Sequence, residues 1–303
     1  MIQEIDMATY HPQLRTALIM ADYGGGKTHL CGTARKPLMV FSFDKGYDTI
    51  ALQPGIKVVS ILEENRRRPT AWREFCIRFD KWLVGEEYTW PDGRKERYKT
   101  GALDSGTFLS QYCLNHFQAI NNNIDRKATY TEYQQIKENM SDVLAKIKRM
   151  TEYMLMTALL RTDKDEQTGE VLTQPNIIGS LRDELGAHFD AVFYLYVERK
   201  PQGKEEYYMK TVGGYRERGK IRLPVHIKAI VKPIEEPDFG KLLDKIEARV
   251  REDAGQIATP VKEKPMQQEA APVKQPVAAK VAPKPALPKP IPRPASQTGG
   301  KKA

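Results

Sequence analysis

The residues best suited to binding a phosphate group lie between positions 18 and 30, where the sequence reads LIMADYGGGKTHL. Three consecutive glycines followed by Lys-Thr match the Walker A phosphate-binding pattern, with Ala21 where a first glycine is usual. Glycine lets the backbone curl around a phosphate, so that successive N–H groups and the following helix N-terminus point at it. The expected nucleotide-binding residues are Ala21, Asp22, Tyr23, Gly24, Gly25, Gly26, Lys27, Thr28 and His29.

The Lys-Thr pair has two separate tasks in such a loop. Lys27 would reach the β- and γ-phosphates of ATP as a catalytic group, and Thr28 would hold Mg²⁺. A run of glycines could also form a plain flexible turn. Here an apolar strand pattern precedes the glycines and a helical pattern follows them, which is the context that a phosphate loop requires. ATP and Mg²⁺ are therefore the expected cofactors.

A magnesium site beside such a loop needs an acidic side chain at the end of a neighbouring strand. Asp104, in the sequence TGALDSGT, is the best candidate and would share the metal with Thr28. The strand before it is weak, because Gly101 and Ala102 stand where bulky apolar residues are commoner. Asp is also a favourable residue for beginning a helix. A metal-binding role and a helix N-cap role both stay open for Asp104.

A second candidate carboxylate follows another apolar segment. Asp44 ends the sequence FSFD, and α/β sheets bind their ligands at the carboxyl ends of parallel strands. Asp44 would then lie near the phosphates as a catalytic group. An ordinary loop aspartate is the alternative.

Short apolar segments alternate with helical patterns along the chain, which predicts an α/β fold with a mainly parallel sheet. Apolar residues at helical spacing predict core-facing helices around residues 72–83 and 133–150. Residues 89–94 predict a hairpin turn, and a last helix is expected from Phe239 to about Arg251. The expected strands contain residues 18–20, 38–41, 57–61, 154–157 and 191–196.

The composition changes near residue 255. The last 49 residues hold 10 of the 20 prolines, and nine Lys or Arg against two Glu. The first 254 residues carry 39 basic and 37 acidic side chains, so most of the net charge of +9 belongs to the tail. We predict a folded domain over residues 1–254 and a disordered basic tail over 255–303, because the tail has too few large apolar residues to offset its ordering entropy. The tail could hold DNA loosely or serve as a solubilising linker.

The sequence excludes several classes of protein. Cys31, Cys76 and Cys113 are widely spaced without a CxxC pair, which indicates reduced packing residues rather than disulfides or a zinc site. No apolar run approaches the roughly 18 residues that a membrane span requires. The N-terminus lacks the charged start and apolar run of a signal peptide. We therefore expect a cytoplasmic protein without a membrane partner.

Five short segments occur in the order seen in phage RecA-like ATPases: residues 21–28, 43–44, 103–105, 156–158 and 219–222. The chain resembles the phage nucleotide-binding family that includes the Sak-type single-strand annealing proteins with a RecA core. The likeness covers roughly residues 14–224, and the phosphate loop is its most specific part. It implies a RecA-like P-loop core that handles single-stranded DNA during recombination, and a phage protein working in the cytoplasm of a bacterial host.

The resemblance also implies roles for single residues. Thr157 matches a strand position that senses the γ-phosphate. Lys220 and Arg222 match a basic pair that reaches the nucleotide of a neighbouring subunit, which implies a homo-oligomer in the form of a ring or filament. Ordinary strand residues are the alternative for Thr157, and two solvated strand cations are the alternative for the pair.

RecA-like enzymes activate the attacking water with a glutamate shortly after the second strand. This chain has Lys45 and Gly46 in that neighbourhood, so the catalytic base is not identified. Asp44 or Asp48 could substitute, or hydrolysis could be slow.

DNA contacts are expected between residues 198 and 222, after the strand that ends near Val197. Basic groups there would neutralise phosphates, and interleaved aromatic rings would stack on bases without reading sequence. A solvated hairpin with alternating charge would contain the same residue types. The resemblance adds single-stranded DNA as a partner, with a single-strand binding protein as a second. The expected DNA-binding residues are Arg199, Lys200, Lys204, Tyr207, Lys210, Arg216 and Arg218.

Two functions of different classes follow from these patterns. The first is an ATP-dependent recombination protein that binds and anneals single strands. The second is a solitary P-loop ATPase, such as a replication helicase loader or another NTP-dependent enzyme. Binding to oligo-dT with and without ATP separates them, because only the first requires single-stranded DNA.

Overall fold

The computed structural model describes residues 7, 10–150, 152–164, 169, 171–214 and 219–258, with side chains described up to residue 255. Arg216, Arg218 and the predicted tail beyond residue 258 lie outside the described residues. The last helix, α7, runs from Phe239 to Ala258, so the helix crosses the predicted boundary at residue 254. The division into a domain and a disordered tail stays a prediction.

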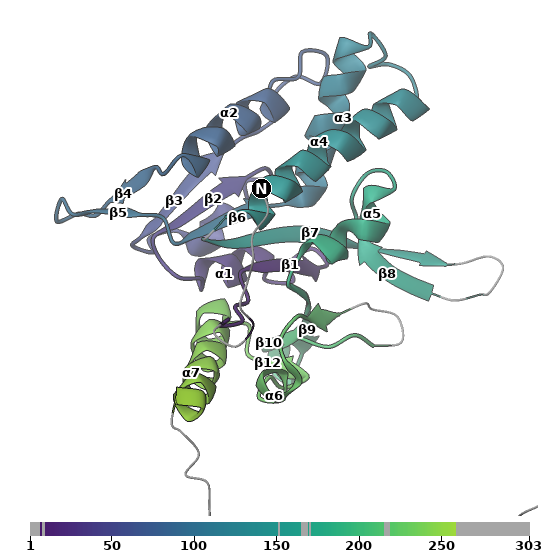
Figure 1. Cartoon of the computed structure of the whole chain (residues 1–303). Helices are drawn as coiled ribbons and strands as arrows, with labels where there is room; N and C mark the ends of the chain where they lie inside the picture. The colour runs from purple at the N-terminus through teal and green to yellow at the C-terminus, as the bar shows by residue number, and fades with distance from the viewer. Residues whose placement is uncertain are drawn as a thin grey trace, which may run out of the picture. The chain divides into compact units, whose positions relative to one another are not determined.

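A single large sheet organises the described chain, in the order β12-β10-β9-β1-β7-β6-β2-β3 (Figure 1). The strands from β9 to β3 run parallel, which confirms the predicted mainly parallel α/β fold. β10 and β12 add antiparallel pairs at one side. The path contains β1 (Thr16–Ala21), β2 (Leu38–Ser42), β3 (Ile56–Ser60), β6 (Thr100–Asp104), β7 (Tyr153–Lys164), β9 (Ala191–Arg199), β10 (Glu205–Lys210) and β12 (Ile234–Glu235).

Two strands pair off this path, and both are antiparallel. β8 (Val171–Pro175) pairs with the end of β7, and β11 (Lys220–Ile221) pairs with the start of β9. A separate hairpin of β4 (Glu87–Thr89) and β5 (Lys95–Arg97) contains the predicted turn. The remaining short elements are η1 (Gly46–Ile50), α5 (Leu181–Glu184), η2 (Leu185–His188), η3 (Pro201–Gly203) and α6 (Val225–Lys228).

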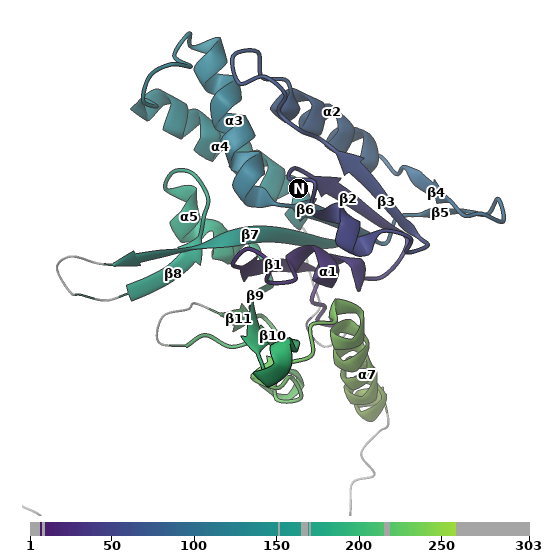
Figure 2. The ribbon, with the colours of Figure 1, turned by 180° about the vertical axis from the view of Figure 1, so that it is seen from behind.

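Helices cover both faces of the sheet, as Figures 1 and 2 show from opposite sides. Helices α2 (Ala71–Leu83), α3 (Gly106–Ile120) and α4 (Tyr130–Lys148) lie on one face, and α1 (Lys27–Gly32) with α7 on the other. Side chains alternate between the two cores along each strand because the strand period is two. In β2, Met39 and Phe41 face α2, while Leu38 and Val40 face α1 and α7.

The core under α2 is rich in aromatic rings. Phe41 of β2 makes edge contacts with Phe75, Phe79 and Trp82 of α2, with ring centroids 5.6 to 5.9 Å apart. Such pairs contribute about 0.5–1.5 kcal/mol each beyond the area that they bury. The predicted apolar stripe of this helix is therefore confirmed as core. In the second predicted stripe Tyr133 differs, because this residue is 42 % exposed on the outer side of α4.

The weak strand around Gly101 is fully buried and sits in the middle of the sheet. A Cβ on Gly101 would lie 2.5 Å from the indole of Trp82 and from the Met154 sulfur, so only glycine fits beneath these two side chains. The low bulk of this strand is thus a packing requirement. β6 carries Asp104 at its end, where the candidate site lies.

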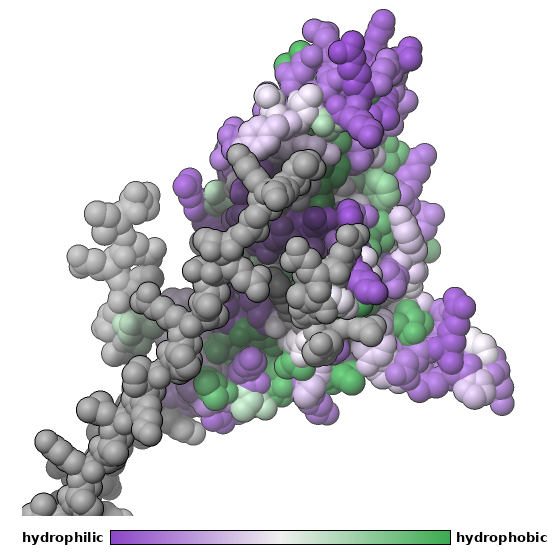
Figure 3. All heavy atoms as spheres, turned by 90° about the vertical axis from the view of Figure 1, so that its right-hand side faces the viewer, coloured by the Kyte–Doolittle hydropathy of each residue, from purple (hydrophilic) through white to green (hydrophobic). Residues whose placement is uncertain are grey.

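The surface on the side of the β7–β8 hairpin is mainly hydrophilic where its atoms are described, with smaller hydrophobic areas between (Figure 3). Among the described residues, no helix has the length and apolar character needed to cross a membrane.

Candidate nucleotide-binding site

The phosphate loop connects the buried strand β1 to helix α1, which begins at Lys27. Gly24 and Gly26 have φ angles of 73° and 81°, in the left-handed region that favours glycine. A Cβ on Gly25 would lie only 2.6 Å from the Cβ of Ala21. Ala21 can therefore replace the usual first glycine because residue 25 has no side chain to meet it.

Lys27 folds over the loop and holds it together. Its Nζ donates hydrogen bonds to the carbonyl oxygens of Ala21 and Asp22, at 3.1 and 2.8 Å. Burial lowers the pKa of the Lys27 ammonium, while the carboxylates of Asp104 and Asp44 act to raise it. Among the described residues, the hydrogen-bond partners of this cation are the two carbonyl oxygens, which phosphate oxygens can replace.

The candidate metal site is built from two side chains that the sequence predicts. The Thr28 hydroxyl donates to Asp104 Oδ2 at 2.6 Å, which joins the phosphate loop to the end of β6. The Thr157 hydroxyl on β7 donates to the other oxygen, Oδ1, at 2.5 Å. Ser105, and not Asp104, is the N-cap residue of α3. The helix-cap alternative for Asp104 is therefore wrong.

The surroundings of Asp104 disfavour the charged form of its carboxylate. The residue is 1 % exposed, and burial raises its pKa, although the two hydroxyl hydrogen bonds and the Lys27 charge act in the opposite direction. No arginine or lysine among the described residues forms an ion pair with it within 4 Å. A divalent cation would supply the missing positive charge, and carboxylate and hydroxyl oxygens are ligands that Mg²⁺ accepts. The residues present therefore fit Mg²⁺.

Thr157 lies at the candidate metal site, on the strand beside Asp104. Its side chain is fully buried, and its hydroxyl is engaged with Asp104. In this arrangement Thr157 orients the carboxylate that would meet the metal. Contact with a γ-phosphate stays a prediction.

Asp44 lies beside Thr28, two residues beyond the end of β2. Its Oδ1 accepts a hydrogen bond from the Gly46 N–H at 3.0 Å. A Cβ on Gly46 would lie 3.1 Å from this oxygen and 3.2 Å from Thr28 Oγ1, so both groups border the same small space. Asp44 is exposed and lines the cleft of the phosphate loop. Asp48 is not among the residues that line it.

The cleft around the loop has a volume of about 790 Å³. Tyr23 and His29 line it, as the sequence predicts. Its opposite wall was not predicted to contact a nucleotide and comes from the turn at residues 236–238, which joins β12 to α7. The sequence marks this turn only as a helix start. Its role depends on long-range packing, for which the sequence carries no local signal. Other lining residues outside the nucleotide-site prediction are Thr33, Gly46, Thr49, Phe108, Leu159 and Leu195.

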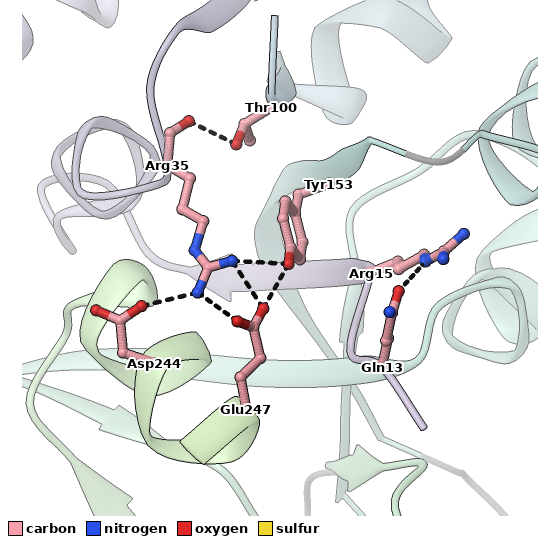
Figure 4. A network of polar contacts seen from close by, with 7 residues as sticks. All are labelled: Gln13, Arg15, Arg35, Thr100, Tyr153, Asp244 and Glu247. Atoms are coloured by element: carbon pink, nitrogen blue, oxygen red, sulfur yellow. Dashed lines mark hydrogen bonds and ion pairs between the residues drawn. The ribbon is translucent and has the colours of Figure 1, made fainter. Parts of the chain in front are cut away.

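A polar network holds α7, and with it this turn, against the segment that follows α1 and the start of β7. Arg35 donates two hydrogen bonds to Glu247, at 2.7 and 2.9 Å, one to Asp244, and one to the hydroxyl of Tyr153 (Figure 4). Tyr153 in turn donates to Glu247 at 2.6 Å. At the start of α7, the Phe239 N–H donates to Thr33 Oγ1 at 2.8 Å. Hydrogen bonds at the start of α7 and further along it therefore hold the turn at residues 236–238 in place beside the cleft.

The predicted DNA-binding residues divide into two groups. Arg199 pairs with Glu205 at 3.3 Å, Lys200 with Glu198 at 2.8 Å, and Lys204 with Glu206 at 3.1 Å. These cations neutralise acids of their own hairpin, which favours the solvated-hairpin alternative for them.

Tyr207 has another environment. Its ring lies over the phosphate loop, 3.0 Å from the place where a Cβ of Gly26 would stand. Tyr207 lines the cleft of the phosphate loop, and together with Lys210 it also lines a second cleft beside the outer turn of the loop.

Lys220 and Arg222 lie at the other end of the sheet. Lys220 pairs with Val192 at the start of β9, and the Arg222 N–H donates to the Asp190 carbonyl. The phosphate loop follows the opposite, carboxyl ends of the parallel strands. The pair therefore does not contribute to the cleft of its own chain. Ile221 between them is buried, as period-two geometry predicts.

The family profile described as the AAA domain matches residues 14–223. The chain belongs to the AAA domain family. This AAA domain is a P-loop ATPase domain, which implies binding of a nucleotide and usually of Mg²⁺. The comparison with curated proteins gave no match. One similar solved structure is a prototypical ATPase from the type III secretion system of pathogenic bacteria, with 15 % identity and a TM-score of 0.37. The likeness covers 61 % of this chain and 52 % of that one, so the chain spans about half of that structure.

Proposed function

We propose that this AAA domain binds ATP with Mg²⁺ and hydrolyses its γ-phosphate. The main support is the hydrogen bond of 2.6 Å between Thr28 Oγ1 and Asp104 Oδ2, together with Lys27 at the centre of the loop. These groups come from separate parts of the chain and meet only in the fold. The metal, when bound, neutralises charge on the phosphates and orients them.

Each residue has a task in this proposal. Lys27 releases the carbonyls of Ala21 and Asp22 and binds phosphate oxygens. Thr28 and Asp104 hold the metal, and Thr157 orients Asp104. Asp44 is the exposed carboxylate at the edge of this site, and it accepts the proton of the water that attacks the γ-phosphorus as the bond to the β-phosphate oxygen breaks.

The binding of nucleotide is tested with a fluorescent ATP analogue. Lys27→Ala should weaken its affinity by about a hundredfold or more, because charge-assisted hydrogen bonds to phosphate are lost. Lys81→Ala, on the exposed side of α2, is the matched control and should keep the wild-type affinity. An unchanged affinity of Lys27→Ala for the ATP analogue would refute the proposal that the phosphate loop binds nucleotide.

We further propose that the domain acts on single-stranded DNA in annealing or recombination, as in the RecA-like phage family that it resembles. The second cleft supports this proposal, with a volume of about 780 Å³ beside the loop. Tyr23 and Tyr207, 82 % and 40 % exposed, line it together with Arg199 and Lys210. Since the hairpin cations are paired, stacking on the tyrosines carries more of this binding than phosphate neutralisation does.

A gel shift with oligo-dT tests the DNA proposal. Tyr23→Ala and Tyr207→Ala should each weaken binding by roughly tenfold, since stacking contributes about 1–3 kcal/mol per base. Tyr130→Ala, an exposed tyrosine of α4, is the control. A protein that binds nucleotide but ignores single strands would instead support the solitary ATPase, including the helicase loader.

The place of Lys220 and Arg222 supports a proposal for assembly. Because the pair lies at the amino edge of the sheet and the loop at the carboxyl edge, head-to-tail stacking would bring the pair of one subunit to the loop of the next. The ATPase rate should then rise with protein concentration. Mixing Lys27→Ala with Arg222→Ala subunits should restore part of the activity. A mixture as inactive as its components, beside an active oligomeric wild type, would refute the arrangement.

A further inference from the structure

The hydroxyl of Ser42 is buried and has no hydrogen-bond partner among the described residues. Ser42 is the last residue of β2 and is 0 % exposed. A buried hydroxyl without a partner costs free energy, because it has given up its hydrogen bonds to water. Its position next to the candidate site suggests that the partner arrives with the ligand.

Register places Ser42 beside the metal-binding carboxylate. Ser42 pairs with Asp104 across the parallel strands β2 and β6, whose backbones lie about 4.8 Å apart. Two residues earlier, Val40 and Ala102 both belong to the core on the α1 face. Side chains two residues apart share a face, so Ser42 and Asp104 project side by side under the phosphate loop.

The two carboxylates nearest to Ser42 in register and in sequence already have other donors. Both Asp104 oxygens already accept hydrogen bonds, from Thr28 and Thr157. Asp44, two residues further along the chain, uses its Oδ1 for the Gly46 N–H and faces Thr28. Ser42 thus lies beside Asp104 in the sheet and two residues before Asp44 in the chain, next to the cleft that Asp44 lines.

We propose that Ser42 is a water-positioning residue that substitutes in part for the missing catalytic glutamate. When the Mg²⁺–nucleotide is bound, its Oγ hydrogen-bonds the water between Asp104 and Asp44 and fixes it for attack on the γ-phosphorus. Asp44 takes the proton of that water, the bond between the γ-phosphorus and the bridging oxygen breaks, and ADP and phosphate result. This inference rests on the proposed ATP hydrolysis.

The alternative is that Ser42 is a small packing residue whose unpaired hydroxyl is merely tolerated. The two explanations differ in what Ser42→Ala does. A packing residue would lose nothing in catalysis. If Ser42 is a positioning residue, Ser42→Ala would lower kcat by about tenfold or more and change KM for ATP much less, because the attacking water loses its orientation.

The experiment combines steady-state kinetics with thermal unfolding, which needs no turnover. Without ligand, Ser42→Ala should raise the melting temperature by roughly 2–4 °C, since the unpaired hydroxyl is gone. The further rise that Mg²⁺–ADP produces in the wild type should be smaller in the variant. Ser42→Cys, of similar volume and with a weak donor, covers the case in which alanine disturbs folding and should show an intermediate kcat.

Ser110 supplies a matched control. It is equally buried, but its hydroxyl donates to the Thr107 carbonyl at 2.8 Å and accepts from the Ile178 N–H. Ser110→Ala should therefore lower the melting temperature and keep kcat, the reverse of Ser42→Ala. Wild-type kcat and a full Mg²⁺–ADP response in Ser42→Ala would overturn the role of Ser42. A wild type that does not respond to Mg²⁺–nucleotide would overturn the proposed function itself, and the inference with it.

Discussion

The amino edge of the parallel sheet, where its strands begin, and the carboxyl edge, where they end, differ in how their polar side chains are paired. At the amino edge, Asp190 Oδ2 accepts three hydrogen bonds from Arg15 and Thr16, and Arg35 is surrounded by Glu247, Asp244 and Tyr153. At the carboxyl edge, Asp104 has two hydroxyls and no counter-ion within 4 Å among the described residues. At the amino edge the partners of Asp190 and Arg35 belong to the fold itself. At the carboxyl edge Asp104 leaves the position of a counter-ion open to a ligand.

The pKa shifts follow the same division. At the amino edge, burial opposes the charge of Glu247, but hydrogen bonds from Arg35 and Tyr153 lower its pKa nonetheless. At the carboxyl edge burial prevails, and it raises the pKa of Asp104 and lowers that of Lys27, so both charged forms are disfavoured. A perturbation of this kind in a cleft marks a functional site. The Mg²⁺–nucleotide would supply the missing charges.

The largest expected effect comes from exchanging one carboxylate at each edge. Asp104→Asn should lower the ATPase rate by about a hundredfold or more, since the metal contributes several kcal/mol of charge stabilisation. Asp190→Asn removes a carboxylate of similar connectivity at the opposite edge. It should leave the rate nearly unchanged and lower the free energy of unfolding. Equal losses of activity in both variants would break the comparison.

The sequence predicts this site better than it predicts the wall around it. The phosphate loop is visible because its chemistry requires fixed residue types at fixed spacing. Asp104 is visible because a magnesium site needs an acidic side chain at the end of a neighbouring strand. The turn at residues 236–238 and the place of Tyr207 over Gly26 depend on how β10, β12 and α7 pack, which no local pattern encodes. Paired and unpaired cations also look alike in a sequence. The hairpin around Lys200 therefore suggests a DNA surface, although its charges are neutralised within the hairpin.

The second prediction tests the paired edge. Arg35→Ala leaves Glu247 without its bidentate partner, and both side chains are about one-third exposed or less. We expect a loss of about 2 kcal/mol in the free energy of unfolding, less than the value for a fully buried pair because water screens the charges. Urea unfolding measures it. Lys146→Ala, which breaks the exposed pair with Asp80, should cost less than about 0.5 kcal/mol.

Arg35→Ala should also weaken nucleotide binding modestly, because α7 holds the turn at residues 236–238 against the cleft. An affinity several-fold lower, with a normal rate at saturating ATP, is the expected pattern. A variant that is destabilised but binds as the wild type does would show that the wall does not contact the nucleotide.

The third prediction concerns pH and the protein without ligand. Because the pKa of Asp104 is raised in the folded state, the folded state holds a proton at pH values where the unfolded state has lost it. Wild-type stability should therefore fall as the pH rises from the ordinary range of an aspartate through the raised value. Asp104→Asn does not titrate and lacks this fall. Its stability relative to the wild type should increase with pH toward neutrality, and the advantage should vanish in acid.

Thermal unfolding of the wild type and Asp104→Asn between acid and neutral pH measures this difference. Mg²⁺–ADP should reverse the order of the two proteins at neutral pH, because only the wild type gains the metal contact. A constant difference across the pH range would show that the charge of Asp104 is not disfavoured in the fold.

The smallest effect is expected when the predicted basic tail is removed from the domain. Ending the chain after Ala258 removes nine Lys or Arg and two Glu and leaves α7 complete. If the predicted domain folds without the tail, the melting temperature and the ATP affinity stay as in the full chain.

The tail is expected to affect the binding of oligo-dT. Each lost phosphate contact reduces the magnitude of the slope of log K against log salt by about 0.7. Loss of a tail that makes two or three loose contacts would thus reduce the magnitude of the slope by about 1.4 to 2.1 and the affinity only modestly. Tyr207→Ala in the shortened chain would still weaken binding. If truncation abolishes DNA binding, the tail and not the tyrosine cleft is the DNA site, and the carboxyl edge serves the nucleotide alone.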